Sequence, residues 1–168
     1  ADLGRPEAEA ILMDYLNVLQ EIRHARHHLR AWMKPRGVWQ TLATFGSSAR
    51  VETQPRGTCL IIAPWNLPFH LALGPLASCL AAGNAAIVKP SELAPATSAL
   101  LARMLAETFP PDLVAVVEGD KAAAEAAACA CRAVRSSNRD PAVAPGRPGR
   151  LPFPRCDRGP LASDASRA

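Results

Sequence analysis

The chain has 168 residues, 49% of them hydrophobic and 20% charged, which suits one globular domain with a core of its own. Its net charge of +4 is unevenly distributed. Residues 1–131 carry 11 Lys and Arg against 12 Asp and Glu, whereas residues 132–168 carry 8 Arg against 3 Asp. The basic character therefore belongs to the last segment, and the body of the chain gives no indication of a nucleic-acid partner.

The cysteines and the apolar runs indicate in which cellular compartment the protein is expected. None of the five cysteines forms a CxxC pair, and the chain opens without the pattern of a cleavable secretion signal. A disulfide framework or a zinc site is therefore not expected. No apolar run approaches the roughly 20 residues of a membrane-spanning helix. The sequence predicts a soluble, cytoplasmic protein.

The first expected element is a long amphipathic helix over residues 7–33. Its apolar residues recur at alternating steps of four and three, which places them on one helical face. They are Ile11, Tyr15, Val18, Ile22, Ala25, Leu29 and Trp32. The other face is basic, and there His24 and His28 lie four residues apart, a spacing that can bind a metal. Because no third ligand is nearby, we interpret this face as solvated and expect no metal site.

Short apolar runs then alternate with helical patterns. A short strand or hairpin is expected over residues 47–56. Further strands are expected over residues 58–62, 85–88 and 113–117, and helices over 71–82, 96–109 and 121–131. The first two of these strands read as buried on both faces. This alternation predicts an α/β fold, a Rossmann-like parallel sheet with right-handed crossovers and flanking helices, preceded by the long N-terminal helix.

Polar clusters follow each expected strand, at residues 63–66, 89–92 and 118–120. Ligands of parallel sheets bind beyond the carboxyl ends of the strands, so the three clusters are expected to converge on one edge. The Glu92 carboxylate can accept hydrogen bonds from both hydroxyls of a ribose, while Lys89 can donate to them. Asn66 offers an amide donor suited to a developing oxyanion. Taken alone, each cluster is more readily explained as a cap of the next helix.

Two other kinds of site find no support in the sequence. Neither GxGxxG nor GxxxxGK[ST] occurs, so no common phosphate-binding loop is indicated. Cys59 and Cys79 fall inside an expected strand and helix, where we interpret them as small core residues rather than nucleophiles.

Two longer motifs give the sequence a family resemblance. The segments PRGTCLIIAPWNLPFHLALGP (residues 55–75) and LAAGNAAIVKPSEL (residues 80–93) closely resemble the coenzyme-binding domain of NAD(P)-dependent aldehyde dehydrogenases. The branch acting on medium-chain and fatty aldehydes is the most similar. The resemblance spans residues 1–131 and implies the N-terminal part of that domain, hence an incomplete aldehyde dehydrogenase fold. It enters the family's opening helix partway, so the usual first helices are expected to be missing upstream of residue 1.

The resemblance also implies roles for individual residues. Asn66 matches the side-chain donor of the oxyanion hole, and Lys89 and Glu92 match the residues that hold the adenosine ribose of NAD or NADP. The rest of the implied cofactor-binding set is Ala63, Pro64, Trp65 and Ser91. Glu92 favours NAD, because a carboxylate would repel a 2′-phosphate. For the intact family the resemblance implies a small-molecule aldehyde substrate and a homo-oligomer, with no nucleic acid and no membrane span.

After residue 131 the sequence departs from the family pattern. The family continues with a Phe-Asp-His strand, a Gly-Ser turn, a general-base Glu and the nucleophilic Cys, none of which occurs here. Residues 132–168 instead carry 8 Arg and 6 Pro, a composition that predicts a disordered tail. Read one base later, back-translated residues 133–138 permit Pro-Phe-Asp-His-Leu-Ile, so we hypothesise a frameshift near residues 128–133, which the coding DNA would test.

Three functions follow as hypotheses. The preferred one is a fragment of an NAD(P)-dependent aldehyde dehydrogenase that binds coenzyme weakly or not at all and is inactive alone. The second is a truncated subunit that docks on an intact dehydrogenase. The third, ranked lowest, is a binding module that uses the basic tail. A sheet cut from a larger one should also leave an uncovered edge and a tendency to aggregate.

Overall fold

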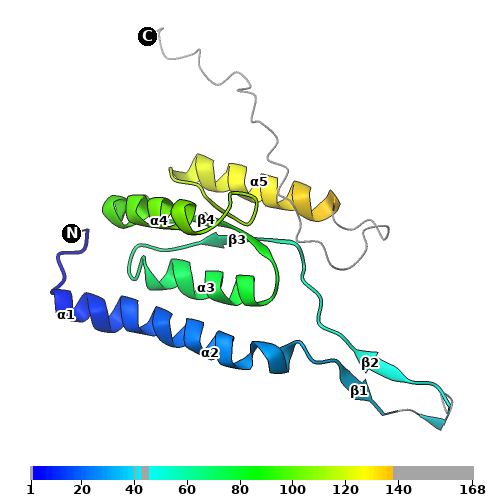
Figure 1. The fold of residues 1–168 in the computed structure, drawn as a ribbon. Helices are drawn as coiled ribbons and strands as arrows, with labels where there is room; N and C mark the ends of the chain where they lie inside the picture. The colour runs from blue at the N-terminus through cyan, green and yellow to red at the C-terminus, as the bar shows by residue number, and fades with distance from the viewer. Residues whose placement is uncertain (1, 40, 43–45, 138–168) are drawn as a thin grey trace, which may run out of the picture.

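The structure is a computed structural model that describes residues 2–39, 41–42 and 46–137. Figure 1 shows a long helical rod, residues 7–32, beside an α/β unit. A hairpin of two short strands, β1 and β2, extends from the end of this rod. In chain order the elements are α1 (Glu7–Ala10), the π-helical turn η1 (Ile11–Tyr15), α2 (Leu16–Trp32), β1 (Arg36–Val38), β2 (Ala49–Val51), β3 (Thr58–Ile62), α3 (His70–Ala81), β4 (Ala85–Lys89), α4 (Pro95–Thr108), β5 (Val114–Val116) and α5 (Lys121–Ser137).

The α/β unit is a three-stranded parallel sheet in the order β3-β4-β5. Residues of α3 and α4 join the strands and Val18 of α2 in one buried cluster. The last helix, α5, packs against β3 and β4. Right-handed crossovers from β3 to β4 and from β4 to β5 put α3 and α4 on the same face, which leaves α5 to cover the other. The predicted Rossmann-like fold is confirmed.

The residues expected to end α3 and to begin α4 do so in the structure. Gly83 follows α3 with a φ of +76°, a conformation that glycine adopts without steric cost. Pro95 is the first residue of α4, where its missing N–H leaves no hydrogen bond unmade. These positions confirm the predicted end of one helix and the predicted start of the next.

The first two strands of the parallel sheet differ in burial. All five residues of β4 are buried, as predicted for a strand covered on both faces. In β3 the prediction is wrong, because Ile62 is 58% exposed and only Thr58 and Ile61 are buried. Among the described residues β3 pairs only with β4 and forms an edge of the sheet. Its outer side therefore lacks the neighbouring strand that would complete the burial.

The predicted N-terminal helix is present, interrupted by the π-helical turn η1. Its apolar face is only half covered. Val18 is 3% exposed, but Ile11, Tyr15, Ile22 and Trp32 each leave between 44% and 50% of their surface exposed. The apolar periodicity thus indicates the helix correctly, while α3 covers only part of the face.

The hairpin is only partly as predicted. β2 falls within residues 47–56, but its antiparallel partner is β1, which the sequence did not indicate. Every residue of both strands is exposed. In Figure 1 the hairpin projects from the end of α2, away from the α/β unit. It therefore adds nothing to the core.

The last helix, α5, continues to Ser137, beyond the predicted end at residue 131. The remainder of the expected tail, residues 138–168, lies outside the described residues, so its disorder stays a prediction. No helix of the described chain has the length and apolarity needed to cross a bilayer.

Candidate functional site

The carboxyl ends of the three parallel strands lie level with one another. The register pairs Ile62 with Lys89 and Val88 with Val116, so β3, β4 and β5 end at one edge. Ala63 N donates to Lys89 O over 3.0 Å, and Val117 N to Val88 O over 2.9 Å. The predicted convergence of strand ends is therefore present, held by backbone hydrogen bonds that run just past the strands.

Lys89 and Glu92 form the most polar part of this edge. The Lys89 side chain is only 4% exposed, whereas that of Glu92 is 51% exposed, and Lys89 Nζ donates to Glu92 Oε2. This hydrogen bond, more than any other influence, lowers the pKa of Glu92 below its usual value. A buried ammonium is costly without an anionic partner. Glu92 thus stays ionised at neutral pH and keeps accessible surface for a ligand that brings hydroxyl donors.

The residues around this pair differ in accessibility. Ser91 is buried, and its Oγ accepts a hydrogen bond from Leu93 N at 3.3 Å, which shapes the turn. Ala63 is also buried, whereas Trp65 is 52% exposed, and Pro64 and Asn66 are exposed as well. The loop after β3 therefore presents Pro64, Trp65 and Asn66 outward, while Ala63 and Ser91 support the backbone beneath.

The helix that follows this loop is anchored by the N-terminal rod. The buried Asp14, in η1, accepts a hydrogen bond from His70 N at the start of α3 over 3.1 Å. His70 Nε2 lies 3.2 Å from Glu21 Oε1, and the Glu21 carboxylate also occupies the space where a side chain at Gly74 would stand. A carboxylate at a helix N-terminus satisfies an otherwise unpaired N–H group. The rod therefore fixes the start of α3, four residues after Asn66.

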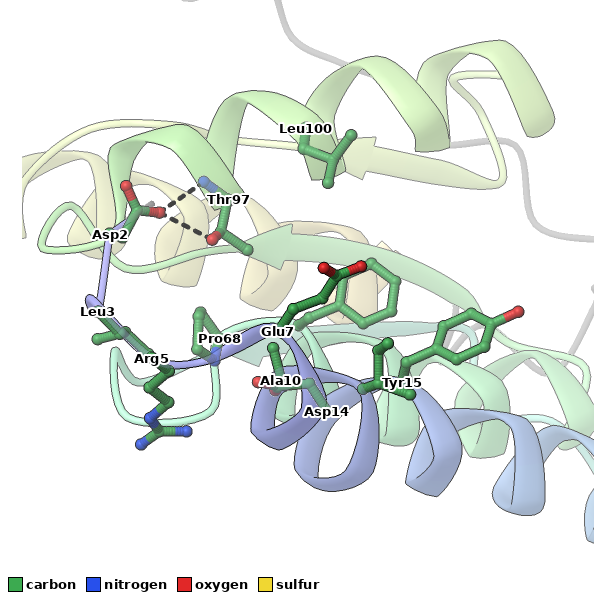
Figure 2. A pocket seen from close by; sticks show the side chains of 12 residues that line it. Asp2, Leu3, Arg5, Glu7, Ala10, Asp14, Tyr15, Pro68, Thr97 and Leu100 are labelled. Carbon is green, nitrogen blue, oxygen red and sulfur yellow. Dashed lines mark hydrogen bonds between the residues drawn. The ribbon is translucent and has the colours of Figure 1, made fainter.

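A second carboxylate ties the start of the chain to α4, as Figure 2 shows. Asp2 accepts hydrogen bonds from Ala96 N, Thr97 N and Thr97 Oγ1 at 3.1, 2.8 and 2.8 Å. Beside it lies a cavity of about 380 Å³ between the N-terminal segment, the loop at Pro68 and α4. None of the predicted site residues lines this cavity.

Sequence reasoning missed both long-range caps, since no local pattern connects Asp2 or Asp14 with a helix so far along the chain.

The third polar cluster serves the fold itself. Ser98 Oγ donates to Glu118 Oε1 over 3.0 Å, which joins the end of β5 to α4. Asp120 Oδ1 accepts from Ala122 N and Ala123 N and so caps α5. Of the three clusters predicted at the edge, this one matches the alternative that strand-end polar residues cap the next helix.

The cysteines inside the fold behave as packing residues. Cys79 is buried in the core cluster, and Cys59 packs against that cluster. Burial, then a hydrogen bond with Cys59 and the charges of Cys59 and Cys131, raises the pKa of Cys79 to about 12. A thiol with so high a pKa is a poor nucleophile at neutral pH.

The histidines of α2 lie on its exposed face, as predicted. The rings of His24 and His28 have centroids 4.2 Å apart, and that of His28 also stacks on Trp32. Within residues 2–39, 41–42 and 46–137, no group of three or more His, Cys, Asp and Glu side chains is arranged to hold a metal ion.

The level strand ends and the helices that connect the strands define a Rossmann-like α/β fold. The profile described as the aldehyde dehydrogenase family matches residues 1–137, so the chain belongs to that family. An aldehyde dehydrogenase of Craterostigma plantagineum is 46% identical over 119 residues, which cover 71% of this chain and 25% of that protein.

Solved structures agree with this assignment. The substrate-bound state of Staphylococcus aureus AldH matches with a TM-score of 0.73 and 38% identity, over 74% of this chain and 27% of that chain. Mycobacterium tuberculosis aldehyde dehydrogenase complexed with NAD⁺ matches with a TM-score of 0.62 and 25% identity, over 76% and 26%. The chain thus spans about a quarter of the length of the relatives it matches.

Proposed function

We propose that this chain supplies part of the coenzyme-binding domain of an NAD(P)-dependent aldehyde dehydrogenase, an enzyme that oxidises aldehydes to carboxylic acids. Its contribution is the corner that holds the adenosine ribose, together with the amide of Asn66. The observation that carries the proposal is the pairing of the buried Lys89 with the half-exposed Glu92 at the end of β4. The matching M. tuberculosis enzyme was solved with NAD⁺, which supports a nicotinamide coenzyme.

The residues at this edge fit the ribose end of such a coenzyme. Glu92 has accessible carboxylate surface for the two hydroxyls, and Lys89 lies beside it as a donor. Ala63, Pro64, Trp65 and Ser91 would line or support the cofactor path. When bound, the nicotinamide supplies the hydride acceptor. Glu92 also favours NAD over NADP, because a carboxylate beside the ribose would repel a 2′-phosphate.

The isolated chain is proposed to be inactive toward aldehydes. Asn66 can stabilise an oxyanion only after a nucleophile has attacked the carbonyl, and the thiolate and general-base Glu of the family pattern do not occur in this sequence. The buried thiol of Cys79, with its raised pKa, does not replace them. Which aldehyde the intact enzyme takes is not assigned, since most of a substrate site would come from the remaining three quarters of such an enzyme.

A titration with the two halves of the coenzyme tests the ribose corner. In ¹H–¹⁵N spectra of the chain, AMP is expected to shift the amides of Ala63 and of residues 89–92, with weak affinity on the order of 1 mM or above. Nicotinamide mononucleotide should leave them unchanged. Glu92→Gln should weaken the AMP response several-fold. Glu107→Gln, at an exposed position on α4, is the matched control and should leave it intact.

Shifts that are absent, or that survive Glu92→Gln unchanged, would contradict the proposed ribose site.

A second candidate function is that of a truncated subunit that docks on an intact dehydrogenase. It is favoured by one observation, the outer edge of β3, which pairs with no other described strand. Unpaired strand edges are templates for pairing with another chain. Co-purification with a full-length aldehyde dehydrogenase, lost when Leu60→Pro removes an N–H from β3, would support it. The third hypothesis rests on the tail, most of which lies outside the described residues.

A further inference from the structure

Three cysteine side chains from three different elements lie together near the start of β3. Cys79 Sγ, on α3, donates to Ala85 O over 3.5 Å. Cys131 Sγ, on α5, donates to Thr58 O over 3.5 Å. The parallel register pairs Ala85 with Thr58, the residue directly before Cys59, so both carbonyls lie beside Cys59. All three cysteines are free thiols.

The side chain of Cys59 faces α3 rather than α5. Alternate residues of a strand share a face, and Ile61 and Ala63 belong to the buried cluster that includes residues of α3 and α4. Cys59 packs against this cluster, and Cys79 is one of its members. A hydrogen bond also joins the side chains of Cys59 and Cys79. Cys79 is therefore the thiol that Cys59 contacts.

The two thiols differ in their access to solvent. Cys79 is 8% exposed, whereas Cys59 is only partly buried. In the described chain β3 pairs with β4 alone, so its outer side is open. A small oxidant therefore reaches Cys59 before Cys79. An edge strand can also shift by the small distance that separates a thiol contact from an S–S bond of about 2.05 Å.

We propose that Cys59 and Cys79 are an oxidative modification site, which a hydroperoxide converts to a disulfide between β3 and α3. In the first step the Cys59 sulfur attacks the peroxide. An S–O bond forms, the O–O bond breaks, and the thiol proton leaves with the released oxygen as water or an alcohol. In the second step the Cys79 sulfur attacks the oxidised Cys59. An S–S bond forms, and the hydroxyl leaves with the Cys79 proton as water.

The electrons of this reaction balance. The pair of sulfurs loses two electrons, and one hydroperoxide gains them. The high pKa of the Cys79 thiol slows the second step, because little of it is thiolate at neutral pH. That step is nevertheless intramolecular, between groups that the fold already holds in contact.

The disulfide closes a loop over residues 59–79. This loop contains the exposed Pro64, Trp65 and Asn66, so oxidation restrains the segment that carries the proposed oxyanion donor. In a reducing compartment such a bond is transient, which makes the modification reversible. The thiol chemistry itself is independent of the proposed coenzyme site.

Trypsin provides a direct test, because it separates these two cysteines from the other three. Cleavage after Arg56 and Arg103, with the bond between Lys89 and Pro90 left intact, yields a peptide of residues 57–103 whose only cysteines are Cys59 and Cys79. The reduced 168-residue chain is treated with hydrogen peroxide, its free thiols are alkylated, and this peptide is weighed by mass spectrometry. Peroxide should lower the number of alkylated cysteines in the peptide from two to none. The peptide should lose two hydrogen atoms, and dithiothreitol should reverse both changes.

Two variants and one change of solvent show whether the fold selects this pair. Cys79→Ser should leave Cys59 oxidised but without a disulfide in the peptide. The matched control combines Cys129→Ser, Cys131→Ser and Cys156→Ser, which keeps both proposed partners and should form the disulfide as the unmodified chain does. In denaturing urea the preference of the unmodified chain for this pair should disappear.

The stability of the oxidised chain gives a second readout. A disulfide restrains the unfolded chain, so oxidation should move the midpoint of urea unfolding to a higher concentration. The proposal would be overturned by a peptide that keeps two alkylatable thiols after peroxide, or by Cys59 bonded to Cys131 instead. A control variant that forms no disulfide, or an equal preference for this pair in urea, would overturn it as well.

Discussion

The two sheets of this molecule are held together by different means. Every residue of β4 is buried between helices, whereas every residue of β1 and β2 is exposed. The parallel sheet is thus stabilised by burial within the chain, at about 25 cal/mol for each Å² of apolar surface removed from water. The hairpin has only its own backbone pairing. Only the parallel sheet has packing within the described chain that can hold a ligand site in place.

The largest expected effect on stability tests burial directly. Leu101, on α4, is fully buried in the core cluster, while Leu42, beside the hairpin, is 98% exposed. Leu101→Ala should lower the free energy of unfolding by about 2–5 kcal/mol, from lost burial and the cavity it leaves. Leu42→Ala should change it by about 0.5 kcal/mol or less. Urea unfolding followed by circular dichroism measures both changes. Similar losses of unfolding free energy in the two variants would contradict the claim that burial stabilises the parallel sheet but not the hairpin.

A smaller effect concerns the connection that places β3 beside β4. The buried Asn84 accepts hydrogen bonds through Oδ1 from Arg56 N at 2.6 Å and Gly57 N at 2.9 Å. Asn84→Ala leaves both donors without an acceptor and should cost about 1–3 kcal/mol in unfolding free energy.

The matched control for this prediction is Asn17→Ala, since Asn17 makes an exposed bond to Met13 O. It should cost much less. Equal losses for the two asparagine variants would show that the Asn84 bonds do not anchor β3.

The smallest predicted effect is the pH dependence of the Asp2 cap. Burial raises the pKa of Asp2, but hydrogen bonds from Thr97 and Ala96 outweigh it and lower the pKa below 3.8. A carboxyl with a depressed pKa stabilises the fold above its unfolded pKa, and that contribution disappears as the pH falls through the folded value. The stability advantage over Asp2→Ala, about 1 kcal/mol at pH 7, should therefore decrease as the pH falls below the pKa of Asp2 in the folded state. An advantage that stayed constant with pH would contradict this account.

The sequence predicted the parallel sheet well because its information is local. Thr58–Ile62 is an apolar run bounded by Gly57 and Pro64, and the structure has a strand with those bounds. The end of β4 and the Lys89–Glu92 pair lie within one sequence motif, residues 80–93. The sequence therefore also predicted which residues meet at this end of the strand. What local patterns cannot show is the number of neighbours a strand has. The exposure of Ile62 was missed for that reason.

The features that the sequence did not reveal depend on distant residues. β1 contains Arg36, Gly37 and Val38, which give no apolar alternation, and its pairing with β2 appears only in three dimensions. The Asp14 cap on α3 joins residues 56 positions apart. The role of Asn66 stays a prediction, because a single amide donor acquires that role only beside a group that attacks the carbonyl.

The central claim is that the chain has the ribose corner and oxyanion donor of an aldehyde dehydrogenase without the group that attacks the aldehyde. Its most direct test is the rate at which the purified chain produces NADH from NAD⁺ and an aliphatic or aromatic aldehyde. We predict a rate equal to that of a control without protein. A rate above that control, abolished by replacing any one cysteine of this chain with serine, would contradict the claim.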